Sequence, residues 1–324
     1  MAHTDGDLLA LAARISNAGR WGPDDELGTL NHISPGKRVE AASLVRTGLT
    51  VSLARPLIAD ASPTARVELD RRLMANPRPD ERTGLPPFAA EYIGLETHQQ
   101  GVTHLDAVGH VGSADGRAYG GRPFGDSLDP DGLRSGSVFA QRTGIFTRGV
   151  LLDLPAALGI EWLDATHEIT PDDLEAAERS AGLRVGRGDA IVVRAGIEAR
   201  ELASGPSALA PGPGADAAGW MHEREIALYS GDAPEHITAA GARILGRAGS
   251  GDDGDPSPAA TTRFPLVFHQ LALASMGLVL LDHARVEPLA LVCRDLGRYE
   301  FLFVAAPLAL PGGTGSPVNP LAIF

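Results

Sequence analysis

Within residues 34–57 the pattern of apolar and polar positions changes from helical to strand-like. Ser34 and Pro35 predict a helix start, because a serine side chain caps free N–H groups and proline suits the first helical position. Apolar residues then recur at helical spacing as far as Gly48, which ends the predicted helix. Residues 49–57 alternate between apolar and polar side chains, which predicts a strand.

The middle of the chain predicts a second helix followed by a central strand. Residues 170–173 place a threonine cap, a proline and two aspartates where the helix dipole favours negative charge. The helix should run to Ser180 or Ala181, because Gly182 stops it. Residues 187–196 then supply a turn and an apolar run typical of a buried strand.

The C-terminal third contains a helix, a glycine and a strand in succession. His269 opens an amphipathic run that ends at Met276, and Gly277 is the predicted helix cap. The apolar run that follows predicts a buried strand that ends in the carboxylate of Asp282. Residues 149–154 predict another short buried strand.

Three segments have little periodicity. Residues 58–88 are polar and proline-rich, and we expect this excursion to fold over a functional site. Residues 203–219 and 248–263 are predicted to be insertion loops, and the second is acidic and of low complexity. We find no internal repeat.

Irregular alternation of helices and strands predicts an α/β protein, of mixed α+β character, with a mixed sheet and flanking helices. The chain has 324 residues, of which 44% are hydrophobic, and this is enough to bury one large core. We therefore expect a single domain over residues 1–324, with an N-terminal extension over about residues 1–48.

The formal net charge of −13 argues against a nucleic-acid or anionic-membrane partner, since such partners require clustered Lys and Arg. We expect a small-molecule substrate instead. The single cysteine, Cys293, excludes an internal disulfide and points to a reducing compartment. The acidic N-terminus lacks the basic region of a signal peptide, and the longest apolar run is too short to span a bilayer. These features predict a soluble, cytoplasmic protein.

The candidate chemistry lies in residues 98–110. In an extended strand, alternate side chains share one face, so His98, Gln100, His104 and Asp106 would project together, with His110 beyond the strand end. An imidazole and a carboxylate two positions apart can bind the same zinc or manganese ion. We therefore predict a divalent metal site on this strand.

The spacing Gln100, His104, Asp106, His110 resembles the signature of a cyclase family of metal-dependent hydrolases, which includes bacterial kynurenine formamidase and isatin hydrolase. Its pattern is His-x-x-x-His-x-Asp-x-x-x-His. Gln100 replaces the commoner histidine, as in a longer-chain branch of the family. The resemblance implies that His104 and Asp106 are metal ligands and that His110 is the general acid/base.

The resemblance extends to other segments. It implies that His269 and Asp282 complete the metal centre, although the family has Glu at the second position. It also implies the cyclase-type swivelling β/β/α fold, a terminal strand, turn and strand over residues 300–323, and assembly as a homodimer or homotetramer. The N-terminal Trp21 segment matches the longer-chain branch.

Trp21, Tyr119 and His98 are the candidate substrate-binding residues, although Trp21 also suits a packed core. A metal site of this kind can activate water for attack on a carbonyl, with His110 moving protons. The main hypothesis is hydrolysis of a C–N bond in an aryl formamide, lactam or similar small amide. The alternatives are a polyketide-type cyclase or dehydratase that uses the same metal centre, and a non-catalytic protein that binds a metal or a small molecule.

Overall fold

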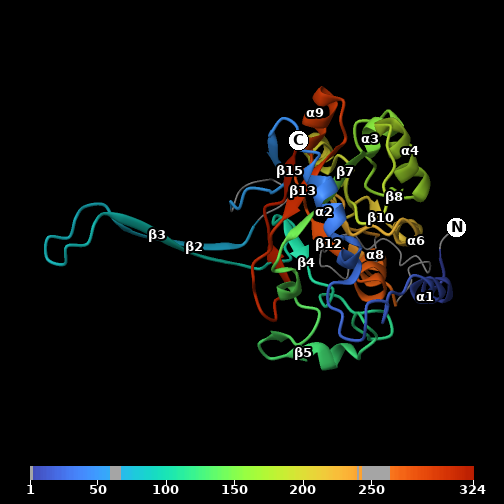
Figure 1. Ribbon diagram of the computed structural model, residues 1–324, viewed down its shortest axis with the longest axis horizontal. Coiled ribbons are helices and arrows are strands. Elements are labelled where there is room, and N and C mark those ends of the chain that lie inside the picture. Colours follow the sequence, from blue (N-terminus) through green and yellow to red (C-terminus); the bar gives the residue numbers. More distant parts are fainter. Residues whose placement is uncertain (1–2, 59–66, 239–240, 243–262) are drawn as a thin grey trace.

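The computed structural model describes residues 3–58, 67–238, 241–242 and 263–324. Nine strands of this part of the chain form one sheet that helices cover (Figure 1). In their order across the sheet, these strands are β1 (Thr50–Ser52), β15 (Leu321–Ile323), β13 (Glu300–Ala305), β7 (Ile145–Asp153), β9 (Ala190–Arg194), β11 (Leu228–Gly231), β12 (Val279–Asp282), β4 (His104–Asp106) and β14 (Gly315–Pro317).

The remaining elements are helices and short two-stranded pairs. The helices are α1 (Asp5–Arg14), α2 (Pro35–Ala42), α3 (Leu154–Leu158), α4 (Pro171–Ala181), α5 (Ile197–Ser204), α6 (Ala215–Glu223), α8 (Val267–His269) and α9 (Glu287–Leu296), with 3-10 turns η1 (Gly28–His32), η2 (Phe124–Ser127) and η3 (Val138–Gln141) and the π-helix η4 (Gln270–Met276). The pairs are β2 (Leu69–Asn76) with β3 (Phe88–Leu95), β5 (Leu128–Asp129) with β6 (Gly132–Leu133), and β8 (Glu168–Ile169) with β10 (Gly212–Pro213).

The centre of the sheet is parallel and its margins are antiparallel. β7, β9, β11 and β12 run parallel, whereas β4, β13, β14 and β15 pair antiparallel with their neighbours. Side chains of the central strands are buried on both faces: Leu152 and Leu280 belong to one apolar cluster, and Leu151 and Leu281 to the other. This explains the apolar runs within these strands, such as residues 150–152, 190–193 and 279–281.

The predicted helix ends are largely confirmed. Ser34 and Thr170 cap α2 and α4, and Gly182 adopts the left-handed conformation at the end of α4. The expected end of the first helix at Gly48 is wrong, because α2 stops at Ala42. Ser43 caps this end of the helix, and its hydroxyl donates to the carbonyl of Glu40.

The strand expected at 49–57 is shorter than predicted, since β1 covers only Thr50–Ser52. The strands predicted around residues 149–154, 187–196 and 278–282, and those over 300–323, are present as β7, β9, β12, β13, β14 and β15.

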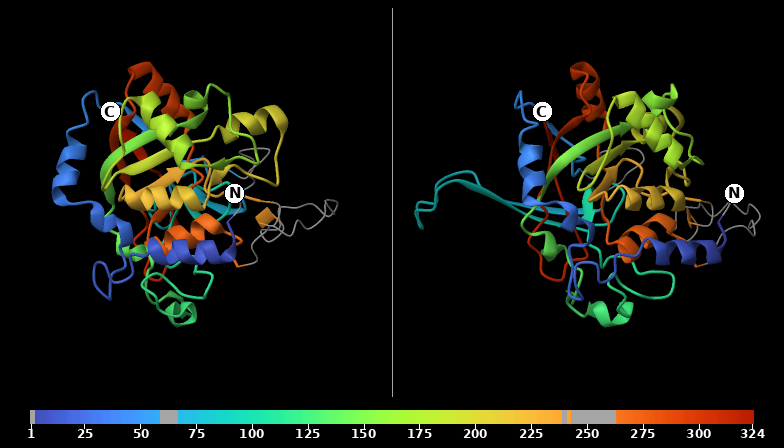
Figure 2. Two further views of the ribbon diagram at one scale, coloured as in Figure 1. Left: turned by 90° about the vertical axis from the view of Figure 1, so that its right-hand side faces the viewer. Right: turned by 45° about the vertical axis from the view of Figure 1, so that its right-hand side comes forward.

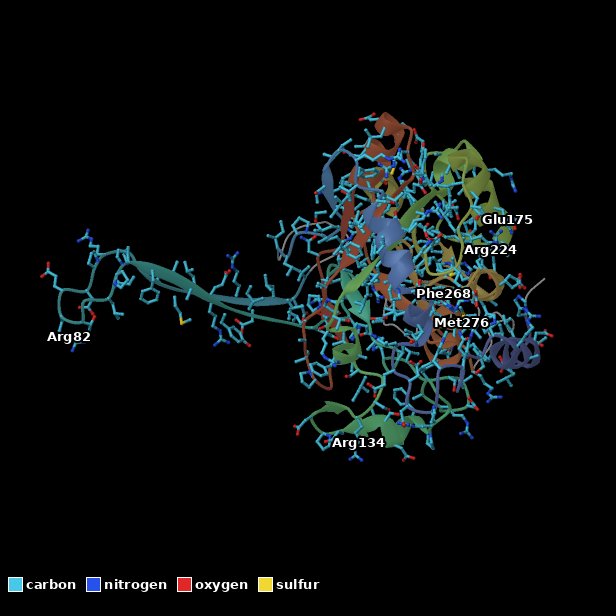
Figure 3. All side chains as sticks on the ribbon, in the orientation of Figure 1. Arg82, Arg134, Glu175, Arg224, Phe268 and Met276 are labelled. Carbon is cyan, nitrogen blue, oxygen red and sulfur yellow. The ribbon has the colours of Figure 1, made fainter. Side chains whose placement is uncertain are left out.

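Within the described part of residues 58–88, residues 69–88 do not fold over the candidate site, which corrects our expectation. From Leu69 the chain forms a long β2–β3 hairpin, here called the arm, which projects away from the body (Figure 1). Figure 3 shows Arg82 at its far end. The eight paired positions explain the projection, because a regular ladder of this length is extended.

The predicted insertion loops have different outcomes. Residues 203–219 are only partly a loop, because α5 continues to Ser204 and α6 begins at Ala215. The second loop lies outside the described residues except for Arg263. Among the helices that the structure describes, none has the length and apolar character needed to cross a bilayer.

Candidate metal centre

The pairing of β4 with β12 brings three candidate ligands to one face of the sheet. His104 lies directly opposite Asp282, and Asp106 lies two residues further along β4. All three side chains are buried, and the His104 Nε2 to Asp106 Oδ1 distance is 3.4 Å. Nδ1 of His104 lies 2.8 Å from the carbonyl of Val102, so it donates there and leaves the lone pair of Nε2 facing Asp106.

The strand predicted from His98 begins only at His104, which is a second correction. Residues 98–103 form a turn before β4. His98 nevertheless reaches the same point, because its Nδ1 lies 2.9 Å from Asp106 Oδ1 and its Nε2 lies 3.0 Å from Thr314 Oγ1. Gly315 makes this possible: a Cβ at that position would lie 2.6 Å from the His98 ring.

His269 enters the site from α8, on the other side of the cluster. Its Nε2 lies 3.1 Å from Asp282 Oδ2 and 3.6 Å from Asp106 Oδ2. The Glu235 carboxylate holds the opposite edge of the ring, since it lies 2.8 Å from Nδ1 and accepts the backbone N–H groups of Phe268 and His269. The π-helix that follows, with its Gly277 cap, packs beside α1 (Figure 2). Asn17, which follows α1, donates to the carbonyl of Met276.

His110 stands at the rim of the cluster. Its ring stacks on that of His98 with centroids 3.7 Å apart, and its Nε2 lies 4.0 Å from Asp106 Oδ2. Burial lowers the pKa of His110 to about 4. The imidazole is therefore neutral at neutral pH and able to accept a proton.

The electrostatics of the cluster fit a divalent cation. Burial alone would raise the pKa of Asp106, but His110, His269 and the other imidazoles hold this pKa well below its usual range. Likewise, burial opposes charge on His269, yet the carboxylates of Asp282, Asp106 and Glu235 raise its pKa well above normal. Three buried carboxylates thus require a compensating positive charge.

Two carboxylate oxygens make the fit more specific. Asp106 Oδ2 and Asp282 Oδ1 are buried and have no hydrogen-bond partner among the described residues. Together with histidine nitrogens, the two carboxylates form two groups of possible ligating atoms. One group consists of His104, Asp106 and Asp282, and the other of His98, Asp106 and His110. Imidazole nitrogens and carboxylate oxygens in this number suit zinc or manganese.

The other predicted site residues have different surroundings. Gln100 lines a pocket next to it, together with Glu235 and His283. Tyr119 donates its hydroxyl to Asp25, and burial raises the pKa of that hydroxyl. Trp21 packs edge-on against His32, with ring centroids 5.1 Å apart. In the part of the chain that the structure describes, the recorded contacts of Tyr119 and Trp21 do not join them to the cluster.

Glu235 is not among the site residues predicted from the sequence. In the sequence, the feature that points to Glu235 is the position of its carboxylate shortly after the buried strand β11. Its partner His269 is 34 residues away, so local spacing does not link the two. Asp232, in the same turn, accepts the backbone N–H groups of Ala195, Gly196 and Ile197 and so fixes the start of α5.

The curled mixed sheet, the flanking helices and the buried His/Asp cluster define an α/β protein with a candidate metal centre. Comparisons with known proteins identify its family. The model of the "Putative cyclase" family matches residues 29–236, so this chain belongs to that family. No curated protein sequence is significantly similar to the chain.

Solved structures confirm the fold expected from the resemblance. A structure described as a novel cyclase is 27% identical, with a TM-score of 0.76 over 95% of this chain and 99% of that one. Isatin hydrolase A from Labrenzia aggregata, bound to benzyl benzoate, is 20% identical, with a TM-score of 0.53 over 87% and 94% of the two chains. An isatin hydrolase bound to the product analogue thioisatinate is 19% identical, with a TM-score of 0.52 over 90% and 99%. At these identities the two hydrolases support the fold alone.

Proposed function

We propose that this protein is a metal-dependent hydrolase that cleaves the C–N bond of a small aryl formamide, lactam or cyclic amide. One observation carries the proposal: four imidazoles surround the buried carboxylate of Asp106. Their nearest nitrogens lie between 2.9 and 4.0 Å from its oxygens. Such convergence of imidazoles on a carboxylate is typical of a metal centre rather than of a packed core.

The residues that would hold the ion are His104, Asp106 and Asp282, with His269 beside them. When bound, a divalent ion supplies Lewis acidity, which polarises a carbonyl and lowers the pKa of bound water to about 7 in the case of zinc. The metal is proposed to be zinc or manganese, because both accept nitrogen and oxygen ligands. Gln100 is an additional candidate ligand.

His110 is proposed to move the protons of the reaction. Because its imidazole is neutral, it can take a proton from the attacking water and then deliver it to the leaving nitrogen. His98 stacks on His110 and bonds to Asp106 and Thr314, so it fixes the plane of the His110 ring. Trp21 and Tyr119 stay proposals for substrate contact.

Cyclisation or dehydration at the same centre is the second candidate, because the structure with a TM-score of 0.76 is described as a cyclase. In that reaction His110 would remove an acidic proton from the substrate. We place either reaction in the cytoplasm, since Cys293 is a free, buried thiol.

The test uses metal-stripped protein with and without added zinc or manganese, and a panel of aryl formamides, lactams and isatin-like compounds. Hydrolysis adds the mass of one water, cyclisation leaves the mass unchanged, and dehydration removes one water. His104→Ala removes a proposed metal ligand. His3→Ala is the matched control, because His3 is paired with Asp216 and is not a proposed ligand. Full turnover in metal-free protein would overturn the proposal, and bound metal without any turnover would leave a binding protein.

A further inference from the structure

A small pocket opens beside the candidate metal centre. It has a volume of about 50 Å³, room for a group the size of a few water molecules. The residues that line it include Gln100, Glu235, His283, Arg55 and Arg200. Glu235 holds His269, and the His283 ring is 5.8 Å from that of His104, so the pocket adjoins the cluster.

Arg200 is the unusual member of this wall. It is only 7% exposed, and its Nε is buried with no hydrogen-bond partner among the described residues. Among the described residues, the carboxylate nearest to the Arg200 guanidinium is that of Glu201. Its Oε1 lies 3.9 Å from Nη2, which is beyond hydrogen-bonding distance. A buried guanidinium N–H group without an acceptor is costly unless a ligand supplies one.

The other acidic residues of the pocket are already engaged. Asp232 accepts three backbone N–H groups at the start of α5, and Glu235 accepts two backbone N–H groups and bonds to His269. Arg55 is anchored by its Nε, which donates to the carbonyl of His283. The two arginines therefore present positive charge to the pocket from fixed positions.

We propose that this pocket binds a carboxylate of the substrate, with Arg200 as the principal contact and Arg55 as the second. A guanidinium offers paired N–H donors that match the two oxygens of a carboxylate. This inference rests on the proposed function and narrows it: the preferred substrate is a small amide that carries a carboxylate next to the scissile bond.

The first test measures binding of benzoate to the full-length protein by calorimetry, independently of turnover. Arg200→Met should weaken binding about 10- to 100-fold, the size of a lost hydrogen bond to a charged group. Arg200→Lys should lose less, because it keeps the charge. Glu201→Gln should tighten binding, since it removes a competing carboxylate. Arg179→Met, at an exposed position on α4, is the matched control and should bind as the wild type does.

A carboxylate could also bind to the metal, and His104→Ala separates the two sites. If the arginine pocket is the site, benzoate binding survives in His104→Ala and is lost in Arg200→Met. The reverse result, or equal binding by Arg200→Met and wild type, would overturn the proposal. Circular dichroism checks that each variant is folded.

The second test compares pairs of amides with and without a carboxylate. The wild type should prefer the carboxylate-bearing member in kcat/KM, and Arg200→Met should lose that preference mainly through KM. Equal preference in the two proteins contradicts the carboxylate site but leaves the hydrolase proposal intact. Failure to hydrolyse either amide contradicts the hydrolase proposal alone, because benzoate binding is measured separately.

Discussion

Replacement of Glu235 by Gln should weaken metal binding although Glu235 is not among the proposed ligands. The Glu235 carboxylate lies 2.8 Å from Nδ1 of His269 and accepts two backbone N–H groups at the start of α8. It therefore orients His269 and makes its Nε2 a better electron donor. The amide keeps the size of the side chain but has only one acceptor oxygen.

The expected magnitude follows from this geometry. Loss of a carboxylate that orients a metal-binding histidine typically costs 10- to 100-fold in metal affinity, or about 1.4 to 2.7 kcal/mol. One buried N–H group also loses its acceptor, so the free energy of unfolding should fall by about 1 to 3 kcal/mol. The fold itself should persist.

The assay is a titration of metal-stripped protein with zinc in competition with a chelator of known affinity, together with urea denaturation. Glu223→Gln is the matched control, since Glu223 is exposed at the end of α6. An unchanged zinc affinity in Glu235→Gln would refute the role of Glu235, even if its stability fell.

Two further predictions concern histidines. His110→Ala should keep metal but lose a factor of about 10² to 10⁴ in turnover, the usual contribution of a general acid/base; loss of metal would instead make His110 a ligand. His32→Gln should remove an acid sensitivity of the fold. Burial lowers the pKa of His32 from 6.5 to about 4, so between these pH values only the unfolded chain takes up the proton. The wild type should therefore lose up to about 3 kcal/mol of unfolding free energy as the pH falls from 6.5 to 4, whereas His32→Gln should lose less; equal losses in urea denaturation would contradict this.

Local signals predicted the parts of the fold that depend on neighbouring residues. Thr170 and Gly182 bound α4 as expected, because capping involves groups a few positions apart. The facing of His104 and Asp106 follows from the two-residue period of a strand. The family resemblance, rather than spacing, pointed to His269 and Asp282.

Contacts between distant segments were not predictable in the same way. His98 reaches Asp106 from a turn, and this requires the absence of a side chain at Gly315. The arm was not predicted, because Leu69–Asn76 lacks the alternation of apolar and polar residues that is typical of a strand. A hairpin that projects from the body has no buried face, so its fold does not require such alternation.

Metal content per chain, measured by elemental analysis in the wild type and in Asp106→Asn, tests the central claim most directly. Asn keeps the size of the side chain but removes the negative charge on which four imidazoles converge. We predict at least one zinc or manganese ion per wild-type chain after equilibration with micromolar metal, and less than about a tenth of that in Asp106→Asn, since an uncharged amide is a poor ligand for these ions. Equal metal content in the two proteins, or none in either, would contradict the account.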